Sequence, residues 1–232
     1  MKLTIANLQK ASAGSGFTRT DLLMSIAVVA VLAAVCVSTL SKVRSEVRLK
    51  VCSRNLKEVS RAVLSFASDH GSTLPGLLQT PAGPSWWWYK DEIRKYTGLM
   101  GESSPQDRLF ACPLDRGYSD PGPFWKNSRF NYTSYVFNGV TLLGTPNIAG
   151  WKLGAVKEPA RTLLVMEWAA HGPLSWHRSR TGKANGPFYR DAESVVAFTD
   201  GHVGLTRIYF DGFNAAFTRD PISGYNYKFS GN

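Results

Sequence analysis

The stretch LLMSIAVVAVLAAVCVSTL, residues 22–40, decides how this chain is organised. It runs for 19 residues without a charged side chain. That is close to the roughly 20 apolar residues that an α-helix needs to cross the hydrocarbon core of a bilayer. No other part of the 232 residues has a comparable apolar run. We therefore expect a single membrane-spanning helix near the N-terminus.

The residues before this helix are basic and carry Lys2, Lys10 and Arg19. A short basic N-terminus predicts a cytoplasmic N-terminal end and an exported C-terminal region. Basic residues also follow the span, at positions 42, 44, 48 and 50, and reduce this asymmetry. A cleaved secretory signal is the alternative, but its apolar region is about 7–15 residues long and ends at a small-residue cleavage site. The run seen here is longer and leads into a further helical pattern.

The helix is expected to continue well beyond the span, because residues 21–69 contain neither Pro nor Gly. It should end at Gly71, and Pro75 follows shortly afterwards. A helix of this length would reach roughly 70 Å at 1.5 Å per residue. Apolar residues at steps of three and four predict that its second half is amphipathic. They are Val43, Val47, Leu56, Val59, Val63 and Phe66.

The remaining sequence, residues 71–232, is rich in turn residues and in short β-type runs. Residues 134–139 and 161–168 each read as a strand, and residues 91–96 as a short helix. Asp200-Gly201, followed by His202, separates two β-prone runs and predicts a hairpin with a type I′ turn. The expected fold is α+β: a long N-terminal helix, first transmembrane and then amphipathic, packed on a small, mostly antiparallel sheet with long loops.

The formal net charge of +10 is concentrated beside the apolar run. Residues 1–70 hold ten of the 27 Lys and Arg and four of the 17 Asp and Glu, which gives +6. The remaining 17 basic and 13 acidic residues give +4. Basic residues next to a membrane span attract anionic lipid head groups. This placement predicts contact with membrane lipid and argues against nucleic-acid binding.

Three cysteines are too few for a disulfide framework, and Cys36 lies inside the apolar run. Cys52 and Cys112 remain, and an exported, oxidising location would allow them to pair. The alternative is two buried free thiols. The sequence alone does not show whether their Cα atoms come within bonding range.

Several groups that are common in catalytic or metal sites gather within 36 residues, but their spacing matches no recognised motif. We therefore expect no enzymatic activity, no cofactor and no metal site. The set is Glu167, His171, His177, Asp191, Glu193, Asp200 and His202. Calcium would need clustered oxygen ligands, for which the C-terminal region offers only the irregularly spaced Asp211, Asn214 and Asp220. The aromatic run at residues 86–89 either covers the sheet or contacts a sugar or protein partner.

The junction between the basic leader and the apolar helix resembles the prepilin signature. Gly16-Phe17 stands at this junction, and Asp21 is the sole carboxylate of the first 45 residues. The resemblance implies cleavage after Gly16 by a prepilin peptidase, methylation of the new N-terminal Phe17, and a role for Asp21 in assembly. The family usually has Glu in place of Asp21, and apolar residues in place of Arg19 and Thr20.

The head extends the likeness to prepilin-like proteins of the H-x9-D-G type. Five short motifs occur in the order seen in that family. They are VCSRNLKEVSRAVLSFASDHGSTLP, LFACPLDRG, SYVFNG, the strand ending at Glu167, and VVAFTDGHV. Arg190 stands where the family has a histidine, ten residues before the Asp-Gly turn. Any function that needs an imidazole at that position is therefore absent or altered.

The resemblance implies a structural subunit of the bacterial inner membrane rather than an enzyme. Residues 1–16 would form the leader, 17–70 the membrane helix and stalk, and 71–232 a head in the periplasm or outside the cell. Partners would be other copies or related pseudopilins, as in type IV pili and type II secretion. The alternative is an unassembled membrane-anchored protein that binds polysaccharide or an envelope protein through its Trp-rich loops.

Overall fold

The computed structural model describes residues 16–76, 86–117, 122–140, 144–170, 175–177, 192–209 and 220–232. The chain divides into two compact units, Met1–Arg44 and Ser45–Asn232. The second unit begins inside the long helix. The second half of that helix therefore belongs to the same compact unit as the sheet.

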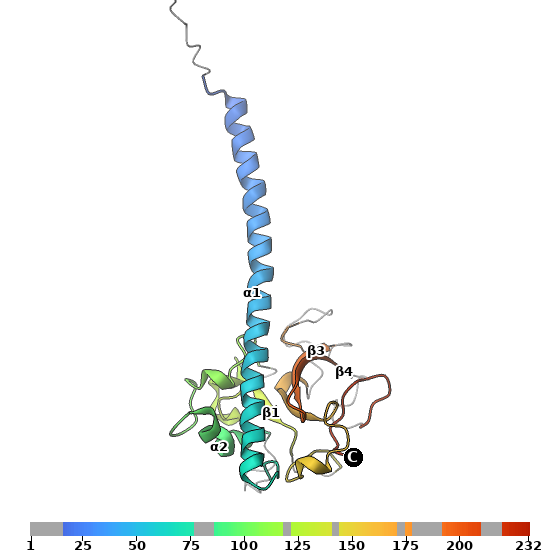
Figure 1. Cartoon of the computed structure of the whole chain (residues 1–232). Helices are drawn as coiled ribbons and strands as arrows, with labels where there is room; N and C mark the ends of the chain where they lie inside the picture. Colours follow the sequence, from blue (N-terminus) through green and yellow to red (C-terminus); the bar gives the residue numbers. More distant parts are fainter. Residues whose placement is uncertain are drawn as a thin grey trace, which may run out of the picture. The chain divides into compact units, whose positions relative to one another are not determined.

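Helix α1 spans Arg19–Asp69 without interruption, as the absence of Pro and Gly predicts (Figure 1). It ends where the sequence indicates, because Gly71 and Ser72 both adopt a positive φ of 62°. The helix is long and apolar enough to cross a membrane.

The second half of α1 packs against the sheet through one face, which confirms the expected α+β fold (Figure 1). Leu56, Val59 and Val63, which the periodicity selects, are buried. Val43 and Val47 are not, since 57% and 53% of their surface is exposed. The amphipathic pattern therefore begins later than the sequence predicts, and these two valines extend the exposed apolar surface of the first half of the helix.

The sheet has four antiparallel strands in the order β1-β2-β3-β4. Their bounds are Tyr135–Phe137, Leu163–Glu167, Ala192–Phe198 and Val203–Ile208. Both strands predicted before the hairpin, at residues 134–139 and 161–168, are confirmed as β1 and β2. All residues of β1 and β2 are buried, which explains why these two strands read as continuous apolar runs rather than as alternating patterns.

Both faces of the sheet are covered. One face joins the α1 side chains in the main core, and the other packs on the C-terminal residues Ile222, Tyr227 and Phe229. A register shift between Leu163 and Val165 interrupts the pairing of β2 with β3. As a result Leu164 and Val165 both belong to the main core that contains the α1 side chains, although consecutive strand residues normally point to opposite faces.

The β3–β4 hairpin forms where Asp200-Gly201 predicts it. The prediction that its turn is of type I′ is wrong. Gly201 has a φ of 89°, whereas Asp200 is not among the non-glycine residues with positive φ. The Gly201 N–H donates to the Phe198 carbonyl, and the Phe198 N–H donates to the His202 carbonyl. This is the three-residue loop in which a type I turn is followed by a left-handed glycine, which requires only one residue with positive φ.

Short helices and long loops pack beside α1. Helix α2 begins at Tyr89, slightly before the predicted short helix, and a 3-10 turn continues it. The bounds are α2 Tyr89–Ile93, η1 Arg94–Thr97, η2 Arg108–Phe110, η3 Phe124–Lys126, η4 Ser128–Phe130, η5 Leu153–Ala155 and η6 Trp168–Ala170.

Helix α2 is joined to the neighbouring loops by a buried cation. The Lys90 ammonium group, fully shielded from solvent, lies 3.0 Å from an Asp107 carboxylate oxygen, and the Arg94 guanidinium binds the same carboxylate. Lys90 also donates to the carbonyls of Asn131 and Tyr132. Both of these residues have positive φ. Burial lowers the pKa of Lys90, and Asp107 opposes that effect.

Candidate functional site

The start of α1 is a reciprocal cap made by Thr18 and Asp21. The Thr18 hydroxyl accepts a hydrogen bond from the Asp21 N–H, at 3.2 Å. Oδ2 of Asp21 accepts from the Thr18 N–H at 2.9 Å and from the Thr18 hydroxyl at 2.7 Å. This is the geometry of a capping box, in which two otherwise unpaired backbone N–H groups are satisfied. Asp21 therefore acts as a helix cap within a single chain.

The residues of the proposed cleavage position are accessible. Gly16 and Phe17 both precede α1 and are exposed, and Phe17 exposes 75% of its surface. Residues 1–15 of the expected leader lie outside the described residues.

The first half of α1 presents apolar side chains around its circumference. Its large apolar residues expose between 50% and 70% of their surface. A helix that is apolar on all sides is normally buried in a membrane or against other helices. We call this the apolar surface of α1; it comprises Leu22, Leu23, Met24, Ile26, Val28, Val29, Val31, Leu32, Val35, Val37, Leu40, Val43 and Val47.

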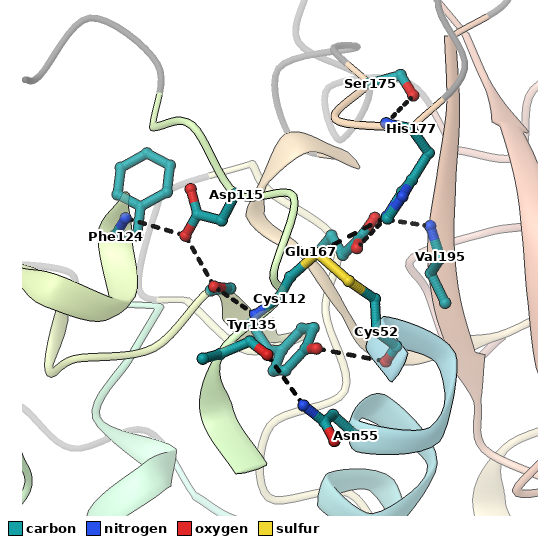
Figure 2. The surroundings of a disulfide bond; sticks show 12 residues. Cys52, Asn55, Cys112, Asp115, Phe124, Tyr135, Glu167, Ser175, His177 and Val195 are labelled. Carbon is teal, nitrogen blue, oxygen red and sulfur yellow. Dashed lines mark hydrogen bonds and ion pairs between the residues drawn. A yellow bond between two sulfur atoms is a disulfide. The ribbon is translucent and has the colours of Figure 1, made fainter. Parts of the chain in front are cut away.

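Cys52 and Cys112 form a disulfide that joins α1 to the loop following η2 (Figure 2). Their Cα atoms are 4.8 Å apart, and 60 residues separate them along the chain. Neither cysteine is exposed to solvent. Asn55, one turn after Cys52, reinforces the junction by donating to the Arg108 and Ala111 carbonyls. Cys36, in the first half of α1, is a free and exposed thiol.

A buried Glu–His pair lies against this disulfide (Figure 2). Nε2 of His177 is 2.6 Å from Oε1 of Glu167, and the two side chains are 1% and 0% exposed. The same Nε2 is 3.8 Å from Sγ of Cys112. The other Glu167 oxygen accepts from the Val195 N–H at 2.9 Å. We call Cys52, Cys112, Glu167 and His177 the disulfide cluster.

Asp115 organises the loop that carries Cys112. Its carboxylate accepts from the N–H groups of Gly117 and Phe124 and from the Ser134 hydroxyl, at 2.7, 2.9 and 2.7 Å. The Ser134 oxygen in turn accepts from the Cys112 N–H. Burial raises the pKa of Asp115 from its ordinary 3.8 to about 6, and the hydrogen bonds only partly offset this effect.

The other residues singled out by the sequence are dispersed. Asp200 and His202 form an exposed pair, with 2.6 Å between Oδ1 and Nδ1, at the hairpin turn. Glu193 lies in β3 opposite Arg207 of β4. Asp220 accepts from the N–H groups of Phe229 and Ser230, so it holds the C-terminal segment. His171, Arg190, Asp191, Asp211 and Asn214 lie outside the described residues.

The aromatic run at residues 86–89 packs into the head. Trp88 is 7% exposed and lies edge-on against Phe137 of β1, while Tyr89 is fully buried. Trp87 is half-buried and contacts Phe130. The backbone carbonyl of Trp86 accepts from the Phe137 N–H, which extends the hydrogen bonding of β1. The run therefore covers one edge of the sheet, as the packing interpretation expects.

Sequence reasoning missed the disulfide cluster as a group. Its members come from α1, the loop after η2, the end of β2 and the segment 175–177, so no local spacing relates them. The available signals were an isolated Cys before Pro113, a Glu ending an apolar strand, and a His after Trp176. The chain matches no protein-family model, no curated protein and no solved structure.

Proposed function

We propose that this chain is a membrane-anchored structural subunit of the pilin or pseudopilin type. It would be cleaved after Gly16 and assembled with other copies or related subunits through α1. The observation that carries this proposal is the apolar surface of α1, which a single chain leaves uncovered. A bilayer covers such a surface in the free subunit, and neighbouring helices cover it in a fibre.

The position of Asp21 supports assembly as well as capping. It is a carboxylate at the very start of the apolar surface, where a charge in or near a bilayer is costly unless it is paired. The capping contacts with the Thr18 side chain and backbone use Oδ2 of Asp21. We propose that Oδ1 pairs with the free N-terminal amine that cleavage would create at Phe17 of a neighbouring subunit.

The alternative of an unassembled glycan-binding protein depends on exposed Trp side chains. Trp88 is buried, and Trp86 and Trp87 are half-buried within the head. Trp88 and Trp87 already pack against Phe137 and Phe130 inside the head, whereas stacking on a sugar needs an exposed ring face. This packing favours the structural role.

Three substitutions separate the capping role of Asp21 from its charge. Asp21→Asn keeps a side-chain oxygen that can accept the Thr18 N–H but removes the negative charge. Thr18→Ala removes the hydroxyl half of the cap and retains the charge. Asp21→Glu retains both functions and restores the residue usual in prepilins. Ser25→Ala is the matched control. Ser25 lies about one turn after Asp21, and its hydroxyl donates to the Leu22 carbonyl rather than to the cap.

The assay is site-specific crosslinking between α1 helices in cells, at equal membrane levels of each variant. We expect Asp21→Asn to lose most of the crosslinked product, and Thr18→Ala, Asp21→Glu and Ser25→Ala to retain it. If Asp21→Asn crosslinks like the wild type, the proposed salt bridge is wrong. If none of the chains, including the wild type, yields α1–α1 crosslinks, assembly through α1 is wrong.

A further inference from the structure

We propose that the disulfide cluster is also a zinc site, occupied when Cys52 and Cys112 are reduced. One candidate ligand atom from each of its four residues lies within 4.8 Å of all the others. They belong to segments distant in sequence, and Figure 2 shows them converging around the two sulfurs. A structural disulfide does not require a buried carboxylate and an imidazole beside it, and burying such groups costs free energy.

The donor set selects the metal. Two thiolates, one imidazole nitrogen and one carboxylate oxygen form a four-coordinate set that suits Zn²⁺, whereas Ca²⁺ and Mg²⁺ require oxygen ligands. All four ligands come from the protein, and Cys52, Cys112 and Glu167 have no exposed surface. A closed, fully protein-ligated zinc site is structural, since a catalytic site keeps one position open for water or substrate.

The distances require small adjustments. Zn–S and Zn–N bonds of about 2.3 and 2.1 Å in a tetrahedron put sulfur and nitrogen about 3.6 Å apart. The Cys112 Sγ to His177 Nε2 distance is already 3.8 Å. The Glu167 Oε1 to Nε2 distance would widen from 2.6 Å to about 3.4 Å. The two sulfurs would separate to about 3.8 Å by rotation of the cysteine side chains once their bond is broken.

The change of state is a balanced two-electron reaction. Two equivalents of a small thiol, each giving one electron and one proton, reduce the disulfide to two Cys thiols and leave as their own disulfide. Zn²⁺ then displaces the two thiol protons to solvent, and the His177 proton moves from Nε2 to Nδ1. Glu167 binds as the carboxylate. In the reverse direction the disulfide of the small thiol accepts two electrons from the two cysteine thiolates and, with two protons from solvent, leaves as two thiols, while the Cys52–Cys112 bond re-forms and Zn²⁺ is released.

The proposed consequence is a junction that holds in both redox states. As a disulfide, the cluster joins α1 to the loop after η2. As a zinc site, it would join the same two segments and add direct bonds to β2 and to the segment 175–177. The head would then remain fastened to α1 under reducing conditions, where the disulfide alone would be lost.

The test uses the full-length chain in detergent, with Cys36→Ser to remove the exposed thiol. Reduced with a phosphine and titrated with Co²⁺, it should bind one ion per chain and show the thiolate charge-transfer and tetrahedral d–d absorption bands. Zn²⁺ should displace the Co²⁺ and abolish these bands. The same protein in its oxidised form should give no such spectrum.

Substitutions identify the ligands. Glu167→Gln and His177→Gln should each weaken Co²⁺ binding by about tenfold or more. His202→Gln is the matched control, because His202 and Asp200 form a His–carboxylate pair with the same 2.6 Å separation but do not belong to the disulfide cluster. It should bind Co²⁺ as tightly as the parent. Unchanged Co²⁺ affinity in Glu167→Gln and His177→Gln would mean that the thiols chelate the ion alone, and would overturn the proposal.

Folding is monitored in parallel by Trp fluorescence. If the reduced chain unfolds without metal, stoichiometric Zn²⁺ should refold it. A reduced chain that is folded but gives no saturable Co²⁺ spectrum overturns the zinc site, and so does a chain that stays unfolded with Zn²⁺. Crosslinking between α1 helices is a separate measurement, so failure here does not bear on the proposed assembly role.

Discussion

Reducing the Cys52–Cys112 disulfide in the presence of a metal chelator should destabilise the head by about 4 kcal/mol. The crosslink spans 60 residues. In the chain-entropy account, closing a loop of that length removes about 14 cal/mol/K from the unfolded ensemble, or about 4 kcal/mol at 25 °C. For a unit of 150–250 residues, each kcal/mol shifts Tm by about 2–4 °C, so the reduced head should melt about 8–16 °C lower.

The measurement follows intrinsic Trp fluorescence of the full-length protein in detergent during thermal or urea unfolding. All seven Trp residues lie between positions 86 and 176. The signal therefore reports on the head and not on the first half of α1. Cys36→Ser is the control for substitution at a cysteine, because Cys36 takes no part in the disulfide. It should leave the unfolding of the oxidised head unchanged.

Two results would refute this reasoning. The first is a shift of less than about 1 kcal/mol on reduction with the chelator present, which would mean that the crosslink does not limit the unfolded ensemble. The second is alkylation of both Cys52 and Cys112 in the native, non-reduced protein. That result would show two free thiols in place of the bond, which is the alternative that the sequence left open.

Three further predictions concern other parts of the chain. Mass spectrometry of protein from cells with an active prepilin peptidase should find methylated Phe17 as the N-terminus, and an intact Met1 would contradict processing after Gly16. Between pH 3.8 and about 6 the folded head retains the Asp115 proton that the unfolded chain has lost, so this residue's contribution to stability falls as pH rises. The unfolding free energy of wild type minus that of Asp115→Asn should therefore drop by about 2 kcal/mol from pH 4 to pH 7, whereas a constant difference would exclude the raised pKa. Asp107→Asn should cost about 3–5 kcal/mol, because it leaves the buried Lys90 without its anionic partner. Glu58→Gln, which affects an ion pair with exposed side chains, should cost less than about 1 kcal/mol and provides the control.

The sequence by itself determined the elements whose signals are local. The continuity of α1 follows from the absence of Pro and Gly over residues 21–69, and its end follows from Gly71. The strands β1 and β2 and the position of the β3–β4 hairpin follow from short β-prone runs and from Asp200-Gly201. The length of the apolar run at residues 22–40 is likewise a property of neighbouring residues. Each of these features depends on contacts within a few positions along the chain.

Only the tertiary structure decided which residues meet. Val43 and Val47 fit the helical period as well as Leu56 does, but both are exposed, whereas Leu56 is buried. The hairpin closed with one left-handed residue rather than two, a difference of backbone torsion that the dipeptide does not specify. Cys52, Cys112, Glu167 and His177 converge because α1, a loop and β2 pack together, and the shift in the pairing of β2 with β3 lies within the strand that ends at Glu167. Such groupings depend on long-range packing across many residues, which no local pattern encodes.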